Sequence, residues 1–257
     1  MIFLKRSWIS AAIVFVSFQA SGQSLFVSQT GSDNHNSCRG ITSPCKTIQH
    51  AVDMSSPVGH AVIKLSPGIY NHGADITHYR FINIDGDCKH RHAVTINVQD
   101  GDAAFTVEDH AVLGVQCMII TGGSTALSSR QFSVLDYVAI TFGPMSVHVS
   151  ASEASKINCG GAIEILSGAI YHIAISGMSQ VSANCDITIP NAVSFSSFAW
   201  VVRKSLFDAS GLTLRGAGVE TTTGQQYIAD GLSLVVQPTV GVIPGHGFTL
   251  GHGAVVE

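Results

Sequence analysis

Short apolar segments return along the chain at nearly regular intervals. Each segment is too short to bury a face within a sheet of its own, so it must stack on the next copy. The intervals between successive segment ends are 20, 25, 24, 25 and 20 residues. The segments end at Ile120, Ile140, Ile165, Ile189, Leu214 and Leu234. This pattern predicts an all-β solenoid with one short strand face repeated on every coil.

An amphipathic segment precedes the coils. Residues 46–55 carry four apolar side chains at helical spacing, and a proline flanks the segment on each side. The open first coil of a solenoid exposes both its core and a strand edge, so we expect this short helix to cap it. We therefore predict a single β-helix domain at 23–257, with an N-terminal cap at 23–60, coils at 61–237 and a tail at 238–257.

The first 22 residues have the pattern of a secretory signal peptide. Lys5 and Arg6 precede an apolar run at 8–18, and small residues at 20–22 suit cleavage before Gln23. An uncleaved anchor is the alternative, although the run is short for a membrane span. No later stretch of 18 apolar residues exists, so no membrane span is expected after the signal is removed. The sequence thus predicts a secreted or periplasmic protein.

Composition narrows the class of partner. Charged residues make up 12% of the chain and hydrophobic residues 46%, which excludes a disordered protein. The net charge is −4, and no basic run follows Arg6. Because nucleic-acid binding needs clustered positive charge, nucleic acid is excluded as the expected partner. The 12 histidines are scattered, and we expect them in polar turns and on the surface.

The six cysteines follow the repeat. Two pairs lie 29 and 26 residues apart, near the length of one coil, and the third brackets a short loop. Residues one coil apart lie on neighbouring strands, about 4.8 Å from each other, which a disulfide can span. Metal ligation is the competing interpretation, but no CxxC motif is present. The spacing predicts the disulfides Cys38–Cys45, Cys88–Cys117 and Cys159–Cys185.

The opening segment carries a family resemblance. LFVSQTGSDNHNSCRGITSPCKTIQHAVDMSS, followed by AVIKLSPGIY, resembles the start of right-handed parallel β-helix proteins of the pectate-lyase-like superfamily. The stretch at 160–236 is similar to β-helix proteins of bacteria and prophages. The resemblance implies a right-handed, single-stranded parallel β-helix with a short capping helix, but it implies no particular activity. The matching residues are Gly31, Asp33, Pro44, Thr47, Ile48, Gln49, Ala51, Val52, Pro67, Gly68 and Tyr70.

The densest group of ionisable residues follows the expected strand at 81–84. In the pectate-lyase family, acidic side chains bind calcium and an arginine or lysine removes a proton from the sugar. The resemblance therefore implies Asp85 and Asp87 as calcium ligands and Lys89 or Arg91 as the catalytic base. Substrate contacts are expected from the remaining candidates, His90, His92, Tyr79 and Arg80. The family's arginine-containing motif is absent, and a solvated coil corner is the alternative interpretation.

Three functions remain open at this point. The first is a secreted β-helix protein that interacts with polysaccharide. The second is a structural or adhesive spike-like module without enzymatic activity, in the form of a homotrimer. The third is a calcium-dependent polysaccharide lyase or a glycoside hydrolase, and the sequence does not decide whether the protein is an enzyme. A groove with clustered carboxylates would favour the first or third function, and a repeated exposed apolar flank would favour the second.

Overall fold

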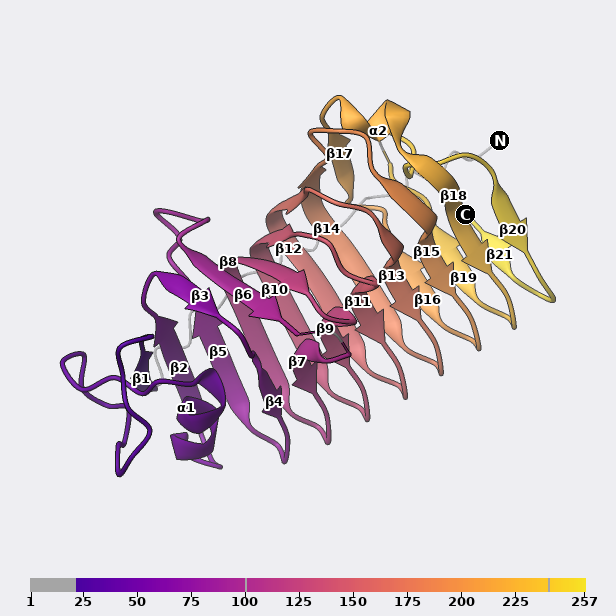
Figure 1. Ribbon diagram of the computed structural model, residues 1–257. Helices are drawn as coiled ribbons and strands as arrows, with labels where there is room; N and C mark the ends of the chain where they lie inside the picture. Colours follow the sequence, from indigo (N-terminus) through magenta and orange to yellow (C-terminus); the bar gives the residue numbers. More distant parts are fainter. Residues whose placement is uncertain (1–21, 100, 240) are drawn as a thin grey trace, which may run out of the picture.

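The structure, a computed structural model, describes residues 22–99, 101–239 and 241–257 (Figure 1). The predicted signal peptide lies outside the described residues, apart from Gly22. None of the helices within these ranges has both the length and the apolar character needed to cross a membrane.

The chain winds into a solenoid of about 8 turns, with about 5% helix. Its strands pair in parallel and form two sheets, which run along the length of the solenoid (Figure 1). The predicted fold class, an all-β parallel β-helix with a short N-terminal helix, is therefore confirmed. Along each strand, alternate side chains enter one continuous hydrophobic core between the sheets.

The larger sheet has 13 strands and the smaller sheet has 8. The larger sheet contains β1 (Gln23–Val27), β2 (His60–Leu65), β3 (Gly68–Tyr70), β5 (Phe81–Asp85), β6 (Val94–Val98), β8 (Val112–Gly122), β10 (Val134–Phe142), β12 (Lys156–Ile165), β14 (Gln180–Thr188), β16 (Leu206–Asp208), β17 (Thr213–Arg215), β19 (Leu234–Val236) and β21 (Val255–Val256). The smaller sheet contains β4 (Ala74–Ile76), β7 (Ala103–Val107), β9 (Thr125–Ser129), β11 (Val147–Ala151), β13 (Ala169–Ile175), β15 (Ser194–Val201), β18 (Thr223–Ala229) and β20 (Phe248–Leu250). A second helix, α2, spans Gly218–Thr221.

The strand register corrects one step of the predicted repeat. Leu214 and Leu234 do not follow each other in one stack, because Leu214 in β17 pairs with Ile187 and Leu234 in β19 pairs with Leu206. The two strands β16 and β17 belong to the same coil and pair with different parts of β14. Apolar spacing alone does not distinguish β16 from β17, because the central side chain of each strand is apolar and packs in or against the core.

The N-terminal helix is α1 (Ile48–Met54), shorter than the predicted 46–55. Thr47 caps it by accepting a hydrogen bond from the backbone N–H of His50. The Asp33 carboxylate in turn accepts bonds from the backbone N–H of Lys46 and from both the N–H and the hydroxyl of Thr47. Asp33 and Thr47, two of the residues behind the family resemblance, therefore build the cap, so they indicate a fold and no chemistry.

All three predicted disulfides are present. The Cα–Cα distances are 4.9 Å for Cys38–Cys45, 4.8 Å for Cys88–Cys117 and 5.6 Å for Cys159–Cys185. The second joins the loop after β5 to β8, and the third joins β12 to β14. Each of these two links ties one coil to the next, as the repeat length requires.

A tight two-residue turn carries the chain from the smaller sheet to the larger one on successive coils, along the lower edge of the solenoid in Figure 1. On seven coils both residues of this turn have positive φ angles between 50° and 70°. The N–H of each second residue donates to the carbonyl of the first residue on the next coil. The second residues thus form a row, here called the corner row: Tyr79, His110, Phe132, Ala154, Met178, Lys204 and Leu232.

Candidate functional site

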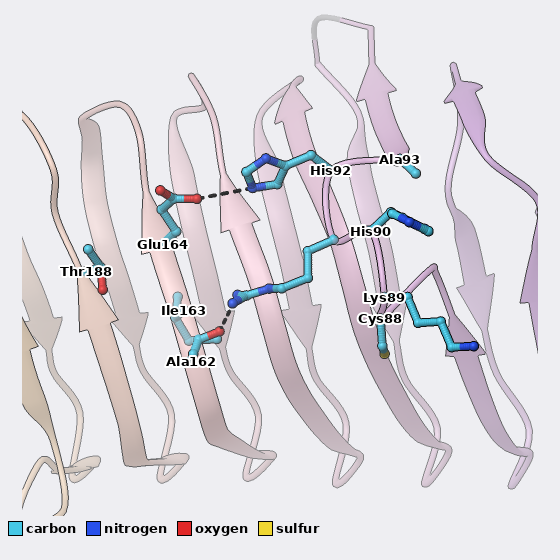
Figure 2. Close-up of a pocket in the computed structure, with 10 residues that line it drawn as sticks. Cys88, Lys89, His90, His92, Ala93, Ala162, Ile163, Glu164 and Thr188 are labelled. Carbon is cyan, nitrogen blue, oxygen red and sulfur yellow. Dashed lines mark hydrogen bonds and ion pairs between the residues drawn. The ribbon is translucent and has the colours of Figure 1, made fainter.

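The loop at 86–93, between β5 and β6, folds back over the neighbouring coils. Cys88 fixes its start to Cys117 of β8. Further along, Nη2 of Arg91 donates to the carbonyl oxygen of Ala162 in β12, at 2.7 Å (Figure 2). β12 is the third strand beyond β5 in the sheet, so the loop and its side chain span roughly 14 Å. Residues 71 positions apart in sequence meet as a result.

An open cleft of about 520 Å³ lies between this loop and strands β12 and β14. His92 points across it toward β12, whereas Lys89 and His90 point the opposite way (Figure 2). Arg91 also reaches β12, through its hydrogen bond to Ala162. The sequence-predicted basic cluster is therefore divided by the loop into two groups. The lining residues are Cys88, Lys89, His90, Arg91, His92, Ala93, Ala162, Ile163, Glu164 and Thr188.

Glu164 of β12 provides the acidic group of the cleft. Its Oε2 lies 3.3 Å from Nε2 of His92, and it accepts a hydrogen bond of 3.3 Å from the hydroxyl of Thr141. Thr141 is fully buried, so its hydroxyl orients Glu164 and is not open to a substrate. An imidazole held by a carboxylate can take up or release a proton, and the guanidinium of Arg91 can bind an anion.

Sequence reasoning did not select Glu164 as a site residue. It stands alone in the apolar stretch GGAIEIL, without an acidic neighbour that would mark a pair. Its partner His92 comes from a loop 72 positions earlier in the chain, and the course of that loop is not periodic.

Asp85 and Asp87, the predicted calcium ligands, have separate partners. Oδ1 of Asp85 accepts a hydrogen bond from Nε2 of Gln116, and burial raises the pKa of Asp85. Asp87 accepts bonds from the backbone N–H groups of Lys89 and His90 and from the His90 ring, which lowers its pKa. Both carboxylates thus face N–H donors, an arrangement that does not fit a shared calcium ion. Calcium binding stays a prediction.

One group of three side chains brings potential metal-ligand atoms close together. Within the described part of the chain, three donor atoms of His, Cys, Asp or Glu side chains approach one another at Cys38, Cys45 and His50. The two cysteines form a disulfide there, so their sulfurs are not thiolate ligands.

Tyr79 and Arg80 lie at the other end of β5 from the loop. Tyr79 belongs to the corner row. The guanidinium of Arg80 donates to the carbonyl of Val52 and, at 3.2 Å, to the hydroxyl of Ser55, which ties α1 to the first coils. The structure therefore does not bring these two predicted substrate contacts to the cleft.

Known proteins show little similarity to this chain. No family profile matches the chain, and no curated protein matches it with significant similarity. Among solved structures, pectin methylesterase from carrot aligns with 91% of this chain and 88% of its own, at 11% identity and a TM-score of 0.34. Similarity at this level carries no argument, and the assignment as a parallel β-helix rests on the strand topology itself.

Proposed function

We propose that the protein is a secreted or periplasmic β-helix that binds an acidic polysaccharide in the cleft beside the loop at 86–93. The observation that carries the proposal is the position of Arg91 and His92, which both line an open cleft on the side of the solenoid and reach β12 across it. Three disulfides suit an oxidising compartment outside the cytoplasm.

The charge of the cleft selects the kind of sugar. Acidic residues outnumber basic ones in the chain as a whole, yet the loop contributes Arg91 and His92 to the side of the cleft that faces β12. A guanidinium recognises the planar carboxylate of a uronic acid better than a neutral hydroxyl group.

The openness of the cleft favours a polymer over a small molecule. It is lined by one loop and by residues of β12 and β14 and is open to solvent, which leaves room for a chain of sugars. The pair His92 and Glu164 supplies a proton-transferring group next to the anion-binding one. Lyase or hydrolase activity, with or without calcium, therefore stays a candidate alongside binding.

A glycan panel on the mature protein tests the proposal. Binding of polygalacturonate or another uronate polymer, but not of a neutral glucan, is the expected result. Arg91→Ala should abolish that binding, while Arg215→Ala, which changes an exposed arginine on β17, should leave it unchanged. New unsaturated or reducing ends that appear only with calcium would identify a lyase. Equal binding by the Arg91→Ala variant would contradict the proposed site.

A structural or adhesive role is the second candidate, because the corner row provides the repeated exposed flank that such a role needs. Exposed fractions reach 69% for Tyr79, 62% for Phe132, 67% for Met178 and 65% for Leu232. A spike-like homotrimer is the form of this role that the sequence predicts. The absence of glycan binding from a folded protein would favour this candidate.

A further inference from the structure

The corner row is apolar or aromatic at six of its seven positions, and it is exposed along several coils. Contiguous exposed apolar side chains on a soluble protein usually mark an interaction surface. The row is separate from the cleft, since it lies at the end of β5 away from the loop at 86–93.

Sugar binding does not explain the aromatic part of the row. The rings of Tyr79 and His110 stack with centroids 4.9 Å apart, and those of His110 and Phe132 with centroids 5.4 Å apart, at interplanar angles of 15°. His110 therefore has a ring stacked on each face, and Tyr79 and Phe132 each have one face covered. A pyranose packs against the face of a ring, so this surface suits side-chain packing from another protein better.

We propose that the corner row is the contact surface of a homodimer, with two copies antiparallel about a twofold axis that passes at Ala154. Ala154 is the fourth of the seven positions, with three coils on either side. The axis places Tyr79 of one copy opposite Leu232 of the other, and Phe132 opposite Met178. The small side chain of Ala154 lets the two backbones approach at the centre. The surface is thus complementary to itself, as a twofold contact requires.

The charges beside the row select this antiparallel arrangement. Asp109 and Arg203 are both first residues of their turns, and each lies two coils from the turn of Ala154. Antiparallel pairing therefore brings Asp109 of each copy to Arg203 of the other. A parallel dimer or a threefold spike would set each coil against its own equivalent, and would place Arg203 and Lys204 against the same cations.

Glu153 lies near the proposed twofold axis, so its charge should weaken the dimer. It is exposed and stands beside Ala154, so the two copies of Glu153 approach each other near the axis. Their repulsion opposes association, and removing it in Glu153→Gln should strengthen the dimer. A surface used for an unrelated partner would show no such effect on self-association.

Sedimentation velocity of the mature protein over a wide concentration range is the test. A monomer–dimer equilibrium is expected, and Asp109→Arg or Arg203→Asp alone should weaken it about tenfold or more. The double variant, with Asp109→Arg and Arg203→Asp together, should restore the dimer affinity, because opposite charges then face each other again across the interface. Asp and Arg already occupy these left-handed positions, at φ 55° and 59°, so the exchanges suit the backbone.

Three controls keep the outcome decisive. Glu220→Lys, on α2 and away from the row, should leave association unchanged. Phe132→Ser should weaken it about tenfold through lost apolar contact, and thermal melts should show that each variant is folded. A monomer at every concentration, a trimer, or a double exchange no better than the single ones would each overturn the proposal.

Discussion

The Nδ1 atoms of His148 and His172 lie 3.0 Å apart within the hydrophobic core, and both side chains are fully buried. One ring must donate its N–H to the lone pair of the other, so the accepting ring is neutral, and burial favours the neutral form of the donating ring as well. Phe142 stacks on His148, and the Nε2 atoms of both histidines have no partner among the described residues. Burial lowers the pKa of His148 to about 4, and burial, together with the repulsion that a protonated His148 would exert, holds the pKa of His172 well below its ordinary value.

We predict that this pair makes the fold sensitive to acid. In the unfolded chain both histidines titrate near their ordinary pKa of about 6.5, so below that pH the unfolded state binds more protons. Their contribution to stability is complete above about pH 6.5 and decreases as the pH falls toward 4. The expected slope is about 1.4 kcal/mol per pH unit for each histidine. Urea denaturation at pH 7.5 and pH 5 measures it.

Replacement of both His148 and His172 separates their effect on acid stability from that of the other titratable groups. His148→Leu with His172→Leu should flatten the pH dependence between 4 and 6.5. The control His246→Gln changes an exposed histidine and should keep the wild-type slope. An unchanged slope in the double variant would show that other groups control the acid response.

The two disulfides between coils should differ in their effect on function. The Cys88–Cys117 and Cys159–Cys185 links close segments of 29 and 26 residues, so chain entropy predicts a similar loss of about 3 to 4 kcal/mol for removing either. Only the first holds the loop at 86–93. Cys88→Ser with Cys117→Ser should therefore lose uronate binding, whereas Cys159→Ser with Cys185→Ser should retain it at temperatures where both are folded. Titration calorimetry and thermal melts measure the two effects, and equal loss of binding would contradict the role of the loop.

Periodic features of this molecule could be predicted from the sequence. The spacing of Cys88 and Cys117 gives their disulfide, because one coil of chain returns a residue to within reach of its neighbour. The pattern at 46–55 gives the capping helix for a similar local reason. Features that depend on a single loop or on one buried contact could not be predicted, because no repeat encodes them. The contact of Arg91 with Ala162 is one example.

The buried histidines show where the sequence argument was wrong. His148 and His172 were expected in turns or on the surface, as polar residues usually are. They stand 24 residues apart in apolar stretches, which is the length of one coil, and that interval was the available indication of stacking. A pair of imidazoles can satisfy one polar atom of each ring internally, so it enters a core that a lone histidine would not.

Close approach of successive coils should make Gly168 intolerant of a side chain. A Cβ at this position would lie 1.9 Å from the carbonyl oxygen of Ser194, which belongs to the backbone of the next coil. Gly168→Ala should therefore destabilise the protein by about 2 to 3 kcal/mol, since a coil must move. In the matched control Gly160→Ala, the nearest atom is a methyl of Val138 at 3.4 Å, and a change below about 1 kcal/mol is expected. Chemical denaturation measures both, and equal effects would contradict the packing argument.

The pair His92 and Glu164 separates binding from catalysis in the cleft. Glu164 is the carboxylate that faces the ligand space, and it holds Nε2 of His92 at 3.3 Å. Glu164→Gln keeps the size of the side chain and its hydrogen bond to Thr141, but removes a negative charge that repels a uronate. Affinity for an acidic polysaccharide should therefore rise, by roughly threefold for a partly exposed charge.

If the cleft is an active site, Glu164→Gln should lower the rate of turnover although it tightens binding. A neutral glutamine no longer stabilises a charged imidazole, so proton transfer through His92 should slow about a hundredfold. Binding by titration calorimetry and product formation by unsaturated or reducing ends are measured on the same preparation, with Asp136→Asn as the control on β10 outside the cleft. Tighter binding without product identifies a binding module, and tighter binding with lost turnover identifies His92 as the proton-transferring group. Weaker binding by Glu164→Gln would contradict an anionic ligand.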